Sequence, residues 1–194
     1  METTQIYVGI DVSQENFQAD ILGKVVVFAN NLEGFESFKG ALPIGSICVM
    51  EATGAYHCHL AYFLYEQGIK VSVVNPLSAK NFALSLMQRA KTDKADAKML
   101  SQYGASLQPT LWQPLAEEIV HLRQILGALD NYIVQHTSLH NQLHSLVLMP
   151  HYSQKVFSSL QEMLVFVEAQ IASLEKETKD LINTHYGELY ENIT

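Results

Sequence analysis

Apolar residues in the first part of the chain alternate between short runs and helical spacing. The short runs are rich in β-branched side chains, which is typical of buried strands. They cover residues 6–12, 17–22, 25–29, 47–50 and 70–74. Elsewhere apolar residues recur every three or four positions, which predicts helices. These predicted helices cover about residues 32–42, 56–67, 77–87 and 93–107.

The order of these elements indicates the fold class. The three leading strands are separated by short turns, so we expect them to be antiparallel neighbours. The later strands alternate with helices, which implies crossover connections and parallel pairing. We therefore predict an α/β domain over residues 1–108, with a mixed sheet flanked by helices in the order of the RNase H-like (RuvC-like) fold.

The last part of the chain has only helical patterns. Residues 109–114, with a proline at each end, are predicted to be a linker, and residues 115–194 a helical segment. In its first helix, apolar and histidine residues alternate spacings of four and three, as in an a/d coiled-coil seam. This seam consists of Leu122, Leu126, Leu129, Ile133, His136, His140, Leu143 and Val147. A second amphipathic helix follows Pro150. The two helices could fold back as a hairpin or pair with a second copy, and we predict that the segment forms a homodimer.

Histidines in the predicted seam allow two interpretations. His136 and His140 occupy seam positions, and His144 follows at helical spacing. They could bind a metal ion, or they could form a polar layer that sets the register and the number of partners. We expect the polar layer.

Composition narrows the classes of partner. The 194 residues carry a formal net charge of -8, which argues against coating of nucleic acid by the whole surface but allows a local basic patch. The two cysteines show no disulfide or zinc spacing, and the N-terminus does not resemble a signal peptide. No apolar run approaches the roughly 18 residues that a membrane span needs. We expect a soluble, cytoplasmic protein without a membrane partner.

Four carboxylates stand at the ends or starts of predicted elements. Asp11 ends the first strand, Glu51 follows the fourth, and Asp93 and Asp96 open a helix after the fifth. Individually they could be turn acids or helix caps. Sites in open α/β sheets form beyond the carboxyl ends of the strands, where these acids could meet. Their hard oxygen ligands suit Mg²⁺ or Mn²⁺, and two such ions promote phosphoryl displacement.

Basic residues gather around the last two of these acids. They are Lys80, Arg89, Lys91, Lys94 and Lys98. They could position the phosphates of DNA or RNA, or they could form an ordinary solvated helix face.

Several ordered motifs resemble those of the RuvC-like DEDD transposases, the insertion-sequence family that includes the Piv-type DNA invertases and the bridge-RNA-guided recombinases. The motifs are GIDVS at residues 9–13, EATGAY at 51–56, VNP at 74–76 and RAKTDKADA at 89–97. The resemblance implies that Asp11, Glu51, Asp93 and Asp96 are catalytic metal ligands, that a coiled coil follows, and that the partners are DNA and a structured guide RNA. The homodimer predicted from the seam could assemble into a tetramer in a full-length protein.

The chain departs from the family pattern in two places. Gln14 stands where many relatives have a basic residue, so we do not count on a phosphate contact at this position. Family members continue into a C-terminal transposase domain that supplies a nucleophilic serine, and this chain ends at Thr194 without it. We therefore expect the metal-bearing N-terminal part of a recombinase active site.

Two functions follow from these patterns. The first is Mg²⁺-dependent cleavage and transfer of DNA strands, guided by RNA. The second is a catalytically incomplete module that dimerises and holds nucleic acid. The actin-like and sugar-kinase ATPases, whose first strand also ends in Asp, need further phosphate and adenosine motifs that we do not find in the sequence.

Overall fold

The computed structural model describes residues 5–52, 54–86 and 93–191, apart from the side chains of residues 93, 94 and 185–191. The chain divides into two compact units, residues 1–114 and residues 115–194. No helix among the described residues is long and apolar enough to cross a membrane.

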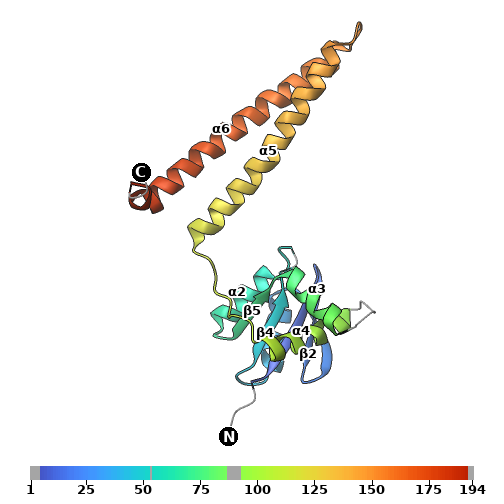
Figure 1. Cartoon of the computed structure of the whole chain (residues 1–194), viewed down its shortest axis with the longest axis vertical. Coiled ribbons are helices and arrows are strands. Elements are labelled where there is room, and N and C mark those ends of the chain that lie inside the picture. Colours follow the sequence, from blue (N-terminus) through green and yellow to red (C-terminus); the bar gives the residue numbers. More distant parts are fainter. Residues whose placement is uncertain (1–4, 53, 87–92, 192–194) are drawn as a thin grey trace. The chain divides into compact units, whose positions relative to one another are not determined.

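The first unit contains a five-stranded mixed sheet in the order β3-β2-β1-β4-β5 (Figure 1). Its strands are β1 (Tyr7–Val12), β2 (Asn16–Ile21), β3 (Lys24–Ala29), β4 (Ile47–Glu51) and β5 (Lys70–Val74). The first three strands pair antiparallel, whereas β1, β4 and β5 pair parallel. The predicted mixed sheet of the RNase H-like fold is confirmed.

Four helices belong to the same unit. They are α1 (Leu32–Ala41), α2 (Cys58–Glu66), α3 (Pro76–Ser85) and α4 (Asp93–Leu107). Two of them begin at asparagine caps, because Asn31 Oδ1 accepts from Gly34 N–H at 2.9 Å and Asn75 Oδ1 accepts from Leu77 N–H at 2.8 Å. Such caps fix the points at which the chain leaves the sheet.

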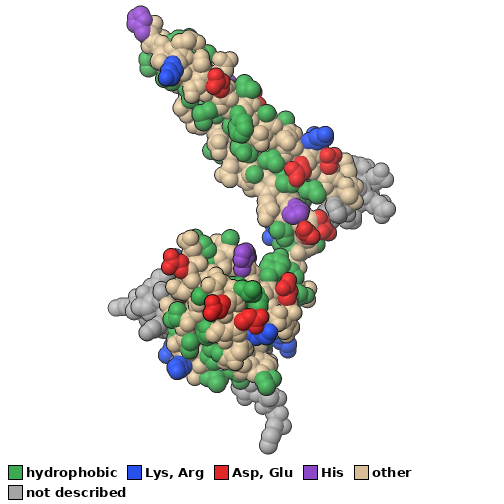
Figure 2. Space-filling model, turned by 180° about the vertical axis from the view of Figure 1, so that it is seen from behind, with side chains coloured by type: hydrophobic (Ala, Val, Ile, Leu, Met, Phe, Trp, Pro, Cys, Tyr) green, Lys and Arg blue, Asp and Glu red, His purple; other side chains and the backbone are tan. Residues whose placement is uncertain are grey.

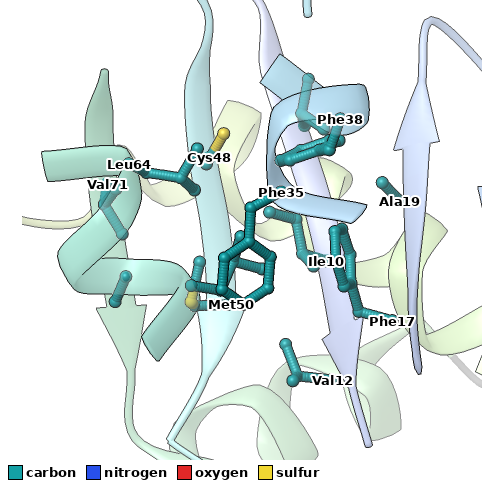
Figure 3. Packing of buried hydrophobic residues seen from close by; sticks show 13 residues of the cluster. Ile10, Val12, Phe17, Ala19, Phe35, Phe38, Cys48, Met50, Leu64 and Val71 are labelled. Atoms are coloured by element: carbon teal, nitrogen blue, oxygen red, sulfur yellow. The ribbon is translucent and has the colours of Figure 1, made fainter. Parts of the chain in front are cut away.

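One face of the sheet carries the larger apolar cluster, which includes the core residues of α1 and α2 (Figure 3). Ile10 and Met50 from the central strands pack among Phe17, Phe35 and Phe38, and all five side chains are buried. The Phe17 and Phe38 rings meet edge to face, with centroids 5.2 Å apart. Burial of these aromatic groups anchors β1 and β4 from one side and leaves their other face for α3 and α4.

The residues predicted to be a linker lie along the β5 edge of the sheet. Trp112 N–H donates to Val71 O at 2.7 Å, and Ser72 Oγ donates to Thr110 O at 2.8 Å. The Trp112 ring meets the rings of Tyr62 and Tyr65 edge to face. These contacts cover an edge strand whose backbone groups would otherwise be open to pairing.

The second unit is a hairpin of two long helices, α5 (Glu117–Val147) and α6 (Gln154–Glu191), which pack side by side (Figure 1). Of the predicted seam, Leu129 is buried, and Leu122, His136 and Leu143 are half-buried. His136 Nε2 lies 3.2 Å from Glu168 Oε1 on α6. The seam of a/d positions is therefore used within one chain.

Half of the predicted seam positions are shifted by one residue. The buried and half-buried seam continues through Ile125, Tyr132, Leu139 and Leu146. The spacing predicted instead the following residues, Leu126, Ile133, His140 and Val147, all of which are exposed. At most of these places two apolar residues are adjacent, so the sequence pattern fits either choice; packing against α6 selects the earlier one.

Candidate functional site

Asp11 and Glu51 stand side by side at the carboxyl ends of two parallel strands. The pairing of β1 with β4 runs up to Ile10 opposite Met50, and Asp11 and Glu51 are the next residues. Successive side chains of a strand point to opposite faces. Since Val8, Ile10 and Met50 lie in the α1–α2 core, the two carboxylates belong to the opposite face of the sheet. Both are half-buried there.

Helix α4 packs on that face and runs antiparallel to β1. A Cβ added to Gly104, near the end of α4, would meet the ring of Tyr7 at the start of β1. A Cβ added to Gly9, further along β1, would lie 2.1 Å from Ala97 O and 2.3 Å from Ser101 N. Because a later strand residue meets an earlier helix residue, α4 begins at the carboxyl end of the strand.

This direction brings the start of α4 to the edge that carries the first two acids. Four helical residues advance about 6 Å, close to the roughly 6.6 Å of two strand residues. Asp93 precedes Ala97 by one helical turn, as Asp11 follows Gly9 by two strand positions. Asp96 lies on the helical stripe of Leu100, which packs with the β4 and β5 side of the sheet. The start of the α4 backbone therefore lies toward the edge of the sheet that carries Asp11 and Glu51.

The described carboxylates do not by themselves form a closed ligand set. Among the side chains that the structure describes, no three Asp, Glu, His or Cys residues come together in a way that could hold a metal ion. Asp11, Glu51 and Asp96 are in the described part, whereas the side chain of Asp93 lies outside it. The role of the four acids as ligands therefore stays a prediction.

Two polar residues of β2 lie on the same face and were not predicted. Gln18 is the strand partner of Asp11, and Asp20 is the partner of Gly9. Asp20 is only 7% exposed, and its Oδ1 has no hydrogen-bond partner in the described part of the chain. The available signal was the alternation in β2, where the buried apolar residues Phe17 and Ala19 flank the polar ones.

The side chain of Asn30 joins the two loops that follow the strand-end acids. Its Nδ2 donates to Ser13 O at 2.8 Å and lies 3.3 Å from Tyr56 O. Ser13 follows Asp11 by two residues, and Tyr56 lies in the turn after Glu51. No periodic pattern identifies such a contact, because it depends on the end of β3 meeting two loops distant in the sequence.

Of the predicted phosphate-binding residues, Lys80 on α3 and Lys98 on α4 have exposed side chains. Arg89 and Lys91 lie outside the described residues, as does the side chain of Lys94. The proposed basic patch therefore stays a prediction.

Comparison with known proteins gives a consistent result. The chain matches the family model of the IS110-type DEDD transposases, described as a transposase, over residues 8–150. It is similar to the pilin gene-inverting proteins of Moraxella lacunata and Moraxella bovis, each at 35% identity over 139 residues. The aligned part covers 66% of this chain and 43% of each relative, so it spans less than half the length of these curated relatives.

Proposed function

Since the chain belongs to the IS110-type DEDD transposases, we propose that its first unit is the metal-bearing part of an active site for DNA strand cleavage and transfer. The observation that supports this most directly is the pair Asp11 and Glu51, adjacent on β1 and β4 and on the face that α4 covers. Both relatives are named as gene-inverting proteins, so the reaction we propose is a DNA rearrangement, either transposition or site-specific inversion.

The donor set fits Mg²⁺ or Mn²⁺. Carboxylate oxygens are the hard ligands that these ions prefer, and two of the acids are fixed by a parallel strand pair. We propose that Asp11 and Glu51 hold the strand side of the site and that Asp93 and Asp96 approach it from α4. A pair of divalent ions, when bound, stabilises the attacking and leaving oxygens of a phosphodiester.

The residues of this chain would orient the nucleic acid around that centre. We propose that the exposed Lys80 and Lys98, with Arg89, Lys91 and Lys94, contact phosphates of the DNA or of a structured guide RNA. The guide RNA rests on the family resemblance alone. The same resemblance places the DNA nucleophile on a serine of a further domain, so the present residues would supply the metal-bearing half of the site.

We also propose that the helical hairpin forms a homodimer, which could assemble further into a tetramer. Large apolar side chains remain exposed along both of its helices (Figure 2). They include Leu126, Ile133 and Val147 on α5 and Val156, Met163 and Phe166 on α6. We take these exposed apolar side chains as the candidate dimer contact, since apolar surface patches often mark interaction sites. Light scattering that finds only a monomer at high micromolar concentration would contradict this assembly.

A second candidate function is a nucleic-acid-binding and dimerisation module that lacks catalysis. Such a module would need only the exposed Lys80 and Lys98 and the exposed apolar residues of the hairpin. The two functions differ in whether the first unit binds Mn²⁺ or Mg²⁺ at the sheet edge.

Titration calorimetry with Mn²⁺ tests the proposal on the chain itself. We expect Asp11→Asn to weaken binding by about tenfold or more, the cost typical of disturbing a metal site. Asp130→Asn, an exposed acid of α5, is the matched control and should bind as the parent does. In crystals soaked with Mn²⁺, we expect density beside Asp11 and Glu51. No binding and no density at millimolar metal would reject the metal site and leave the binding module.

A further inference from the structure

The side chain of Ser101 connects α4 to one residue pair of the sheet. Gly9 and Asp20 are paired residues of β1 and β2. Gly9 N–H donates to Ser101 Oγ at 2.7 Å, and the same hydroxyl lies 3.4 Å from Asp20 O, toward which it donates. One helix side chain therefore contacts a backbone donor of β1 and a backbone acceptor of β2. We propose that Ser101 is a positioning residue that fixes α4 relative to the metal-binding edge.

The surrounding packing makes this contact specific to one register. Gly9 has no side chain, so the backbone of α4 at Ala97 and Ser101 lies directly against β1. Gly104 allows a second close approach one turn later, against Tyr7 and Val49. Glycines permit the approach but have no side chain that favours one axial position over another. The hydroxyl of Ser101 favours one axial position, because it contacts a single residue pair, Gly9 and Asp20.

The Ser101 contact restricts the axial position of α4 to the accuracy that a metal site requires of its ligands. A slip of α4 by one residue moves it about 1.5 Å along its axis and turns it by about 100°. Functional sites need their ligands within roughly 0.5 Å of the productive geometry. Asp96 is five residues before Ser101 on the same helix, so any slip at Ser101 reaches it undiminished. Asp11, by contrast, is held by the strands.

Loss of the hydroxyl should affect position more than stability. In Ser101→Ala, Gly9 N–H and Asp20 O are strand partners and can bond directly to each other, so neither group need remain unpaired. The sheet would then keep its hydrogen bonds, whereas α4 would lose its side-chain contact with β1 and β2. A residue with a merely structural role would give the opposite result, with lower stability and unchanged ligand geometry.

The test compares Ser101→Ala with Ser106→Ala, an exposed serine of the same helix. The inference rests on the proposed metal site. Three measurements distinguish a failure of the positioning role of Ser101 from a failure of the metal site. We expect Ser101→Ala to weaken Mn²⁺ binding by about tenfold, with less than about a tenfold change in the unfolding equilibrium constant. We expect hydrogen exchange to accelerate over residues 95–99 of α4. Ser106→Ala should leave all three unchanged.

Each outcome bears on the proposal. Equal Mn²⁺ affinity and equal exchange in the two variants would overturn it. If the parent chain binds no Mn²⁺, the proposed metal site fails, and exchange alone decides whether Ser101 positions α4. Ser101→Cys replaces the hydroxyl with a larger thiol, which is only a weak donor and acceptor, so it should also lose the contact with Gly9 and Asp20, as Ser101→Ala does. If Ser101→Ala does not fold, the cysteine variant carries the same measurements.

Discussion

Gly9→Ala is the sharpest test of how α4 is placed on the sheet. The added Cβ would lie 2.1 Å from Ala97 O and 2.3 Å from Ser101 N, and both are backbone atoms that no rotamer change can move. An ordinary van der Waals contact begins at about 3.4 Å. The helix must therefore lift by about 1.3 Å at this point, or the strand must bend by the same amount.

The cost of that displacement can be worked out from the contacts it disturbs. Overpacking of a well-packed core costs typically 1–3 kcal/mol. The 2.7 Å bond from Gly9 N–H to Ser101 Oγ would also lengthen, with a loss of about 1 kcal/mol. Relief of the glycine's entropy in a strand returns about 0.5–1 kcal/mol. We expect Gly9→Ala to lower the free energy of unfolding by about 1–3.5 kcal/mol, a large share of the total for an ordinary domain.

The chain offers a specific probe for this measurement. Trp112 is the only tryptophan, and it packs on Tyr62 and Tyr65 of the first unit. Its fluorescence during denaturant unfolding therefore reports on the sheet unit, whereas circular dichroism would include the helical hairpin. Gly40→Ala is the control, because a Cβ there meets nothing within 4 Å. In a helix that change should stabilise by up to about 1 kcal/mol.

The same variant links the stability of the sheet unit to the geometry of the proposed metal site. If α4 lifts as expected, Mn²⁺ affinity should fall together with stability, because Asp96 moves with the helix while Asp11 and Glu51 stay on their strands. A Gly9→Ala chain whose unfolding free energy lies within about 0.5 kcal/mol of the parent would refute this account of how α4 packs on β1.

Two other predictions concern the hairpin and the buried thiol. Ile133→Glu, at a position that is 50% exposed, should preserve the helix content and abolish self-association in light scattering. Leu129→Glu, at a position that is 8% exposed, should instead unfold the hairpin. A parent-like mass for Ile133→Glu would exclude that face of α5 as the dimer contact. Burial raises the pKa of Cys48 to about 12, so above pH 9 the unfolded chain ionises this thiol while the native chain does not. Stability should then fall by at most about 1.4 kcal/mol per pH unit between pH 9 and 12, and Cys48→Val should show a shallower decline in unfolding measured at those pH values. An equal decline of stability with pH in the parent and in Cys48→Val would contradict the raised pKa of Cys48.

The sequence predicted the sheet well because strand signals and their chemistry are local. The run that ends in Asp11 is apolar on both faces, and its pairing with β4 follows from the order of elements. The polar row of Gln18 and Asp20 was present in the alternation of β2, but its meaning depends on which helix covers that face. The contacts of Asn30 and Ser101 join residues 17 to 92 positions apart, and no period in the sequence encodes them.

The coiled-coil seam illustrates a different limit of sequence patterns. At Ile125-Leu126, Tyr132-Ile133 and Leu146-Val147, an apolar residue is available at both neighbouring positions. A heptad pattern alone cannot choose between them, because each choice gives spacings of four and three. The helix that packs against this face makes the choice, and the rejected positions are left exposed. The ambiguity in the sequence and the exposed stripe in the structure thus have one cause.

The proposed arrangement of the four acids would also explain why α4 needs a contact with the sheet that is independent of them. Carboxylates gathered at one edge repel one another unless a cation lies between them. The acids on β1 and β4 cannot separate, because the parallel ladder holds their strands together. If Asp93 and Asp96 lie at this edge as proposed, the helix dipole offsets part of the repulsion, and the rest would push α4 away from the edge when no cation is bound. The contacts that oppose this push lie at Gly9, Ser101 and Gly104, one or more helical turns from the acids. The affinity for metal should therefore depend on residues that touch neither metal nor nucleic acid.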